Sequence, residues 1–92
     1  MIQSFKCDET ERLFTTGKSA KFSSIAKVAT RKLAQLAAAT TLDFLRVPPG
    51  NRLEALQGDR AGQHSIRVNE QFRVCFVWTE AGPADVEIVD YH

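Results

Sequence analysis

The sequence predicts an α+β fold in which N-terminal helices cover one face of a largely antiparallel sheet. Two observations lead to this prediction. Helical periodicity fills the first half of the chain and stops before Pro48 and Pro49. The second half consists of β-branched and aromatic segments with alternating polarity, separated by turn residues. The 92 residues suffice for one hydrophobic core, so a single domain spanning residues 1–92 is expected.

The composition is that of an ordinary globular protein, with 43% hydrophobic and 25% charged residues. No apolar run approaches the roughly 20 residues that a membrane span needs, and the first residues lack the apolar region of a signal peptide. We therefore expect a cytoplasmic protein without membrane contact. Cys7 and Cys75 lack metal-like spacing and are expected as reduced thiols, and no metal or other cofactor is anticipated.

The formal net charge of +1 hides a segregation of charge along the chain. Residues 1–47 carry eight Lys/Arg and four Asp/Glu, whereas residues 48–92 carry four and seven. A basic half favours contact with a polyanion, although exposed lysines on a helix are also found simply solvated.

The first elements are a short strand at residues 2–5 and a compact helix at residues 8–17. Asp8 is the predicted N-cap, with Glu11 as its capping-box partner three residues later. Gly17 supplies the C-terminal stop. The helix has only about two turns, so it needs packing to persist.

A longer amphipathic helix is predicted at residues 21–38. Its core-facing arc contains Phe22, Ile25, Ala26, Ala29, Leu33, Leu36 and Ala37. Its opposite side contains Ser24, Lys27, Arg31 and Gln35, bordered by Lys21 and Lys32. This cationic edge is either a solvated face or a contact surface for a polyanion. Residues 42–45 are expected to add one more turn before the prolines.

Three strands are predicted at residues 64–68, 71–78 and 84–91. A three-residue loop at residues 69–71 pairs Val68 with Phe72 and places Arg67 directly opposite Arg73. A turn at residues 81–83 would pair Trp78 with Val86 and Arg73 with Tyr91. Arg67, Arg73 and Tyr91 are therefore expected in one row across three strands. Strict alternation sends Asp90 and His92 to the other face.

Two arginines directly opposite each other destabilise a sheet, so the Arg67–Arg73 pair needs a compensating anion. One reading is that carboxylates such as Glu54 or Glu87 neutralise it. The other is that a phosphate does, because the planar guanidinium matches phosphate oxygens. The residues alone leave both readings open. His64 and Trp78 are interpreted as sheet and core residues.

Two segments, "GNRLEALQGDRAGQHSIRVNEQFRVCFVW" and the closing "VEIVDYH", resemble the HigB branch of the RelE/ParE toxin superfamily. The resemblance extends over essentially all 92 residues, including "MIQSF", "LFTTGK" and "PPGNRLEAL". It implies a RelE-like fold with two or three helices on a curved, mostly antiparallel sheet. It also implies a toxin of a type II toxin-antitoxin system that enters the ribosomal A site and cuts mRNA. The implied partners are the 30S subunit, mRNA and a HigA-like helix-turn-helix antitoxin, through which alone promoter DNA is contacted.

The resemblance implies an active surface made of Arg73, Asp90, Tyr91 and His92. It makes Arg60 and Arg67 candidate phosphate contacts, with Lys21, Lys27 and Arg31 as further candidate RNA contacts. These types suit RNA cleavage by a 2′-hydroxyl, which needs proton transfer and stabilisation of charge on phosphorus. Arg73 is the expected charge stabiliser, His92 an acid or base, and Asp90 its orienting partner or itself an acid or base. Tyr91 is expected to stack or to donate a hydrogen bond.

Two positions depart from the pattern of the resemblance. Some family members carry a histidine and a lysine where this chain has Glu54 and Gln57. Glu54 is able to replace a base, whereas Gln57 supplies no charge, so we hypothesise weaker cleavage than in members with both cations. The alternative from another functional class is a non-catalytic, ParE-like inhibitor of DNA gyrase. The closing "DYH" and the arginine pair favour the nuclease.

Overall fold

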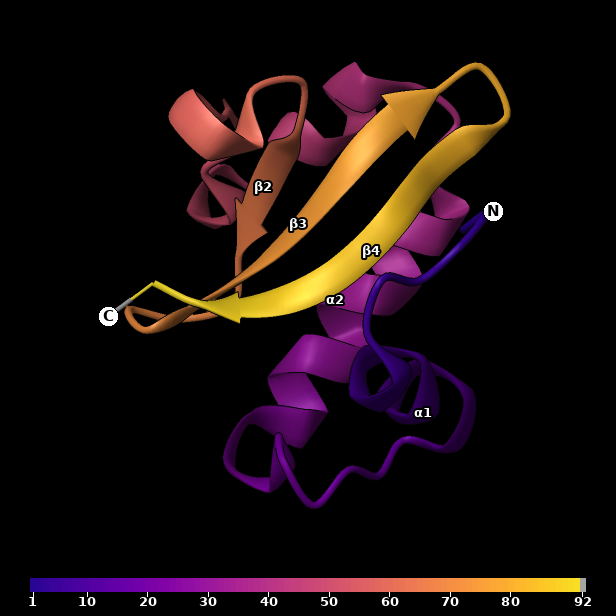
Figure 1. The fold of residues 1–92 in the computed structure, drawn as a ribbon, viewed down its shortest axis with the longest axis vertical. Coiled ribbons are helices and arrows are strands. Elements are labelled where there is room, and N and C mark those ends of the chain that lie inside the picture. Colours follow the sequence, from indigo (N-terminus) through magenta and orange to yellow (C-terminus); the bar gives the residue numbers. More distant parts are fainter. Residues whose placement is uncertain (92) are drawn as a thin grey trace.

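A computed structural model describes residues 1–91, and the position of His92 lies outside the described residues. Helices α1 (Asp8–Thr16) and α2 (Ala26–Ala38) precede the four strands β1 (Glu54–Ala55), β2 (His64–Arg67), β3 (Phe72–Thr79) and β4 (Gly82–Asp90). The strands form one antiparallel sheet in the order β1-β2-β3-β4. Figure 1 shows α2 crossing one face of this sheet. The predicted α+β architecture is therefore confirmed.

Helix α1 ends as predicted, but it already begins at Asp8, the residue that was predicted to be its N-cap. Gly17 has the left-handed φ of 75°, and its N–H donates to the Leu13 carbonyl oxygen at 2.8 Å. The N-cap, however, is Cys7, whose extended backbone accepts a 3.2 Å hydrogen bond from the Glu11 N–H. Asp8 is the first helical residue, so the predicted capping box is wrong. Asp8 and Glu11 instead lie in the first turn, where carboxylates favour the helix dipole.

The predicted second helix is divided into a 3-10 turn, Ser23–Ile25, and α2, so α-helix begins at Ala26 rather than at residue 21. Its apolar arc faces the core, with Ala26 and Ala37 only partly buried. The buried members are Phe22, Ile25, Ala29, Leu33 and Leu36. The expected turn after α2 is the 3-10 helix Leu42–Arg46. None of the helices within residues 1–91 combines the length and the apolar character that crossing a bilayer requires.

The N-terminal segment runs along the outer edge of β4. The Gln3 N–H donates to the Pro83 carbonyl oxygen at 2.7 Å, and the Lys6 N–H donates to that of Val86 at 3.0 Å. The expected strand at residues 2–5 is reduced to one parallel bridge, Phe5 with Val86. This segment thereby covers part of an edge whose backbone groups would otherwise be open to another chain.

The predicted register between β2 and β3 is confirmed. Arg67 pairs with Arg73, and Ile66 pairs with Val74. The loop is closed by Asn69, whose Oδ1 accepts hydrogen bonds from the backbone N–H groups of Gln71 and Phe72 at 2.8 and 2.7 Å. Such side-chain contacts are typical of asparagine in turns. The two arginines therefore share the face of the sheet that points away from the helices.

The predicted register between β3 and β4 is wrong. Trp78 pairs with Pro83, and Arg73 pairs with Val89 rather than with Tyr91. The turn is tighter than expected, because Thr79 already pairs with Gly82. An irregularity opposite residues 75–77 adds one residue to β4, where Asp85 has a φ of 51°. This bulge restores the alternation, so that Val86 and Ile88 still face the core.

Candidate functional site

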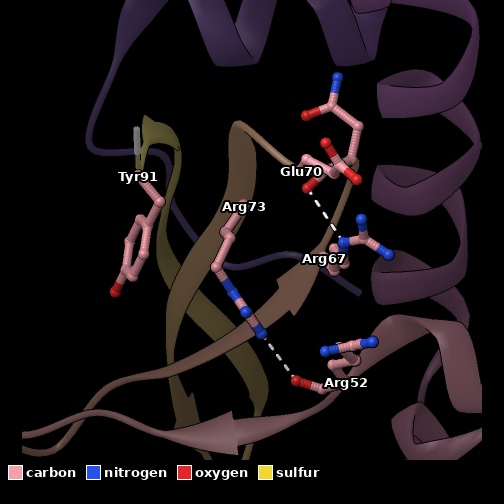
Figure 2. A pocket seen from close by; sticks show the side chains of 6 residues that line it. Arg52, Arg67, Glu70, Arg73 and Tyr91 are labelled. Atoms are coloured by element: carbon pink, nitrogen blue, oxygen red, sulfur yellow. Dashed lines mark hydrogen bonds between the residues drawn. The ribbon is translucent and has the colours of Figure 1, made fainter.

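The candidate site is an open hollow of about 410 Å³ on the face of the sheet that points away from the helices. It is lined by three arginines, one carboxylate, one amide and one phenol. Figure 2 shows these side chains: Arg52, Arg67, Asn69, Glu70, Arg73 and Tyr91. They come from the loop before β1, from β2, from the β2–β3 loop, from β3 and from the residue after β4.

Arg73 is held in place by one protein partner for each nitrogen of its guanidinium. Its Nε donates to the Ser65 Oγ at 2.8 Å, and one Nη donates to the Arg52 carbonyl oxygen at 2.7 Å (Figure 2). The other Nη lies 3.5 Å from a carboxylate oxygen of Glu54. The Arg73 side chain is only 14% exposed. Its charge is therefore fixed in position at the floor of the hollow.

Tyr91 lies beside Arg73, although the two residues are not directly paired. The Tyr91 N–H donates to the Gln71 carbonyl oxygen at 2.6 Å, and its ring centroid is 5.8 Å from the Arg73 guanidinium carbon. Partial burial raises the pKa of the Tyr91 hydroxyl, and the neighbouring Cys75 thiol raises that pKa further. The hydroxyl is therefore protonated at neutral pH and available as a hydrogen-bond donor.

Arg67 and Arg52 retain open guanidinium groups. The Arg67 Nε donates to the Asn69 carbonyl oxygen at 3.1 Å, and neither arginine forms an ion pair within residues 1–91. The expectation that carboxylates neutralise the arginine pair is therefore met for Arg73, through Glu54, and not for Arg67. Arg52 was missed by the sequence analysis, because it stands in an irregular loop whose course no periodicity reveals.

Arg60 lies apart from the hollow. Its guanidinium donates to the Gln63 side-chain oxygen at 3.1 Å and lies 3.6 Å from a Glu87 carboxylate oxygen. Lys6 lies at the same distance from that oxygen. The Glu87 carboxylate on β4 thus pairs with two cations outside the hollow, Lys6 and Arg60, and not with the arginines that line it.

A family model described as "RelE-like toxin of type II toxin-antitoxin system HigB" matches residues 3–92. The chain belongs to this HigB-like toxin family. It is similar to Toxin HigB-1 of Vibrio cholerae, with 42% identity over 82 residues, covering 87% of this chain and 86% of the relative. An uncharacterized protein of Haemophilus influenzae is 41% identical over 54 residues, covering 59% of this chain and 54% of the relative. The protein is therefore a type II toxin with a RelE-like fold, and it has a cognate antitoxin.

The remaining site residues suggested for this HigB-like toxin are dispersed. Asp90 pairs with Phe72 and accepts a 3.0 Å hydrogen bond from the Gln71 side chain, outside the hollow. His92 lies outside the described residues. Glu54 is half exposed and contacts Arg73, whereas Gln57 is exposed at the start of the 3-10 turn Gly58–Arg60. The structure thus brings Arg73, Tyr91, Arg67 and Glu54 together and sets Asp90 apart.

The basic residues suggested before and on α2 of the toxin are solvent-facing. Lys21, Lys27 and Arg31 are all exposed, and the Lys21 ammonium lies 5.5 Å from the Phe22 ring centroid. Lys32 differs, because its Nζ donates to the Asn51 Oδ1 at 2.6 Å. Burial lowers the pKa of Lys32, and the charge of Arg31 lowers that pKa further.

Proposed function

We propose that this toxin is a ribosome-dependent endoribonuclease that inhibits translation by cutting mRNA in the ribosomal A site. The observation that carries the proposal is the fixed Arg73 guanidinium, which lies beside Tyr91 in a hollow lined by two further arginines. Such a group is suited to stabilise negative charge on a phosphate, because its donors are oriented before the substrate arrives. A substrate of this kind places the toxin in the cytoplasm.

The reaction proposed is attack of a 2′-hydroxyl on the adjacent phosphate, with departure of the 5′-oxygen. The attacking oxygen must lose a proton, the phosphate gains negative charge, and the leaving oxygen must gain a proton. Arg73 is proposed to stabilise this charge, because its guanidinium is a cation that presents several N–H donors to phosphate oxygens. The phosphate is proposed to bind at its exposed side.

Proton transfer is proposed to involve His92, Asp90 and Glu54. His92 is the proposed acid or base, and Asp90 orients it or transfers a proton itself. Glu54 is the carboxylate in contact with Arg73, at 3.5 Å, and is half exposed. A phosphate at Arg73 would therefore have a carboxylate within reach, which supports Glu54 as a base. Tyr91 is proposed to stack on a base or to donate a hydrogen bond to phosphate.

Binding to the ribosome and mRNA is proposed to use the basic residues around this site. Arg67 contacts phosphate within the hollow, and Arg60 contacts it from the neighbouring part of the sheet. The phosphate backbone of ribosomal RNA is proposed to be contacted by Lys21, Lys27 and Arg31. The cognate antitoxin is proposed to be a HigA-like helix-turn-helix protein that contacts promoter DNA on behalf of the complex.

The test is to add the purified toxin to translating ribosomes and to map the mRNA ends by primer extension. We expect cuts within the A-site codon that disappear with Arg73→Ala and with His92→Ala. Arg12→Ala is the matched control, because it removes an exposed arginine of α1 that does not line the hollow. Intact mRNA, together with inhibited supercoiling by DNA gyrase, would refute the nuclease and support the ParE-like alternative.

A further inference from the structure

Arg52 has an unusual backbone conformation that its surroundings impose. Its φ is 47°, in the left-handed region that residues other than glycine adopt uncommonly. The Arg52 N–H donates to the Pro49 carbonyl oxygen at 3.1 Å. The preceding Asn51 is fully buried and fixes the loop, because its amide donates to the Leu45 carbonyl oxygen and accepts from Lys32. A conformation maintained in this way points to a role for the residue.

This conformation presents two groups of Arg52 to the same hollow. Its carbonyl oxygen accepts the 2.7 Å hydrogen bond from Arg73, and its side chain lines the hollow (Figure 2). The carbonyl group therefore positions the buried arginine, while the guanidinium remains available to a ligand. No hydrogen bond or ion pair involves the Arg52 guanidinium within the part of the chain that the structure describes.

The three arginines of the hollow consequently differ in what they offer to an anion. Every nitrogen of the Arg73 guanidinium already has a protein partner. Arg67 uses only its Nε, toward Asn69, and its two Nη atoms have no partner among residues 1–91. The hollow contains three arginines and one glutamate, Glu70, among its lining residues, so its lining is net cationic. Most of its open donors belong to Arg52 and Arg67.

We propose that Arg52 and Arg67 form a second phosphate subsite next to the phosphate position at Arg73. This inference rests on the proposed function and deepens it: the toxin binds a single RNA strand through two consecutive phosphates. In Figure 2, Arg52 and Arg67 lie on the side of Arg73 opposite to Tyr91. A strand would thus pass from the Tyr91 ring, over Arg73, to the Arg52–Arg67 subsite. Bidentate guanidinium contacts suit the phosphodiester oxygens there.

The test uses a trinucleotide and a dinucleotide whose 2′-hydroxyls are methylated, so that neither is cleaved. The trinucleotide offers two internucleotide phosphates and the dinucleotide offers one. Their affinities for the toxin are measured by calorimetry at several salt concentrations. The variant is Arg52→Asn, because asparagine tolerates the left-handed conformation and keeps the carbonyl group that Arg73 needs. We expect trinucleotide affinity to fall roughly tenfold, which corresponds to one lost charge-assisted hydrogen bond. The slope of log affinity against log salt should decrease by about 0.7.

Arg12→Asn is the matched control, since its side chain is 66% exposed on α1 and pairs with Glu9. It removes the same charge and should change neither the affinity nor the salt slope. Thermal unfolding of both variants establishes that the fold is retained. The inference is overturned if Arg52→Asn leaves trinucleotide affinity and salt slope unchanged, or if the unaltered toxin binds the trinucleotide no more tightly than the dinucleotide.

The subsite and the proposed function fail in distinguishable ways. Cleavage of mRNA on ribosomes with trinucleotide binding that is insensitive to Arg52→Asn would reject the subsite alone. Trinucleotide binding that depends on Arg52 without any mRNA cleavage would reject the nuclease and leave an RNA-backbone site.

Discussion

Arg67 and Arg73 are directly paired across β2 and β3, yet their guanidinium groups have opposite surroundings. Arg73 is enclosed by Ser65, the Arg52 carbonyl group and Glu54, whereas Arg67 keeps its terminal nitrogens open within residues 1–91. One arginine is thus built into the protein, and its neighbour is available to a ligand. The two like charges are tolerated side by side because the Glu54 carboxylate neutralises Arg73.

Replacing Arg67 should separate stability from activity. Arg67→Thr removes the like-charge pair and introduces a residue that favours strands, so the free energy of unfolding should rise by about 0.2 to 1 kcal/mol. Cleavage of mRNA on ribosomes should fall. Urea unfolding measures the first effect, and Arg67→Lys, which keeps the charge, is the control. A less stable Arg67→Thr variant would contradict the repulsion argument.

Removing the Ser65 hydroxyl should destabilise the protein. Ser65 is fully buried and accepts the hydrogen bond from the Arg73 Nε. Ser65→Ala leaves that charged donor without its acceptor, which costs about 1 to 3 kcal/mol. Urea unfolding measures the loss, and Ser24→Ala, at an exposed serine, is the control. If both variants unfold at the same urea concentration, Arg73 does not depend on Ser65.

Adding a cation at residue 57 should raise activity. Gln57 is exposed, and the proposed weakness of cleavage is attributed to the missing charge there. Gln57→Lys should therefore increase ribosome-dependent cleavage without changing stability. Ala81→Lys adds the same charge at the exposed β3–β4 turn and should have no such effect. Equal cleavage by the Gln57→Lys variant and the unaltered toxin would eliminate this explanation.

The buried Cys75 thiol should make stability depend on alkaline pH. Burial raises the pKa of Cys75, and the Glu87 charge raises it further, against the opposing charge of Arg60. A raised pKa favours the protonated thiol in the folded state, so its contribution is complete below the ordinary thiol pKa of about 8.5. It is lost as pH rises through the folded pKa. Urea unfolding between pH 7 and pH 10 measures the free energy of unfolding, which should decline less steeply with pH in Cys75→Ala than in the unaltered toxin. An equal slope of this free energy against pH would contradict the prediction.

The basic residues on and beside α2 should control the salt dependence of ribosome binding. Lys21, Lys27 and Arg31 are exposed, and each phosphate contact contributes about 0.7 to 0.9 to the slope of log affinity against log salt. Replacing all three with glutamine should reduce that slope by up to about 2 to 3 units. Binding of the variant to purified ribosomes measures the effect. An unaltered slope would mean that these cations are merely solvated.

The parts of the fold that depend on local pattern could be predicted from the sequence. The apolar arc of α2 and the αL stop at Gly17 follow from residue spacing and residue type. The Arg67–Arg73 pairing follows from loop parity. The β3–β4 register could not be predicted in this way, because the turn is tighter than expected and a bulge at Asp85 then shifts the pairings beyond it by one residue. Nothing in the alternation of β4 marks that extra residue.

The candidate site was predicted only where its residues lie on strands or directly after one. Arg67, Arg73 and Tyr91 could be placed on one face from parity, and all three line the hollow. Arg52 could not, because its position depends on buried hydrogen bonds of Asn51 that join α2 to a loop. Such contacts arise from tertiary packing and leave no periodic signal in the chain.

The pairing of the N-terminal segment with β4 bears on when the toxin becomes harmful during its own synthesis. The Val86 N–H donates to the Ser4 carbonyl oxygen at 3.1 Å, and the Lys6 N–H donates to the Val86 carbonyl oxygen, so these backbone hydrogen bonds join residues about 80 positions apart. Contacts this distant along the chain form slowly. Tyr91 follows every other lining residue in the sequence, so the hollow is incomplete until residue 91 has left the exit tunnel. A chain to which residue 91 has not yet been added therefore lacks the complete hollow, so the antitoxin can meet the toxin before its candidate site is assembled.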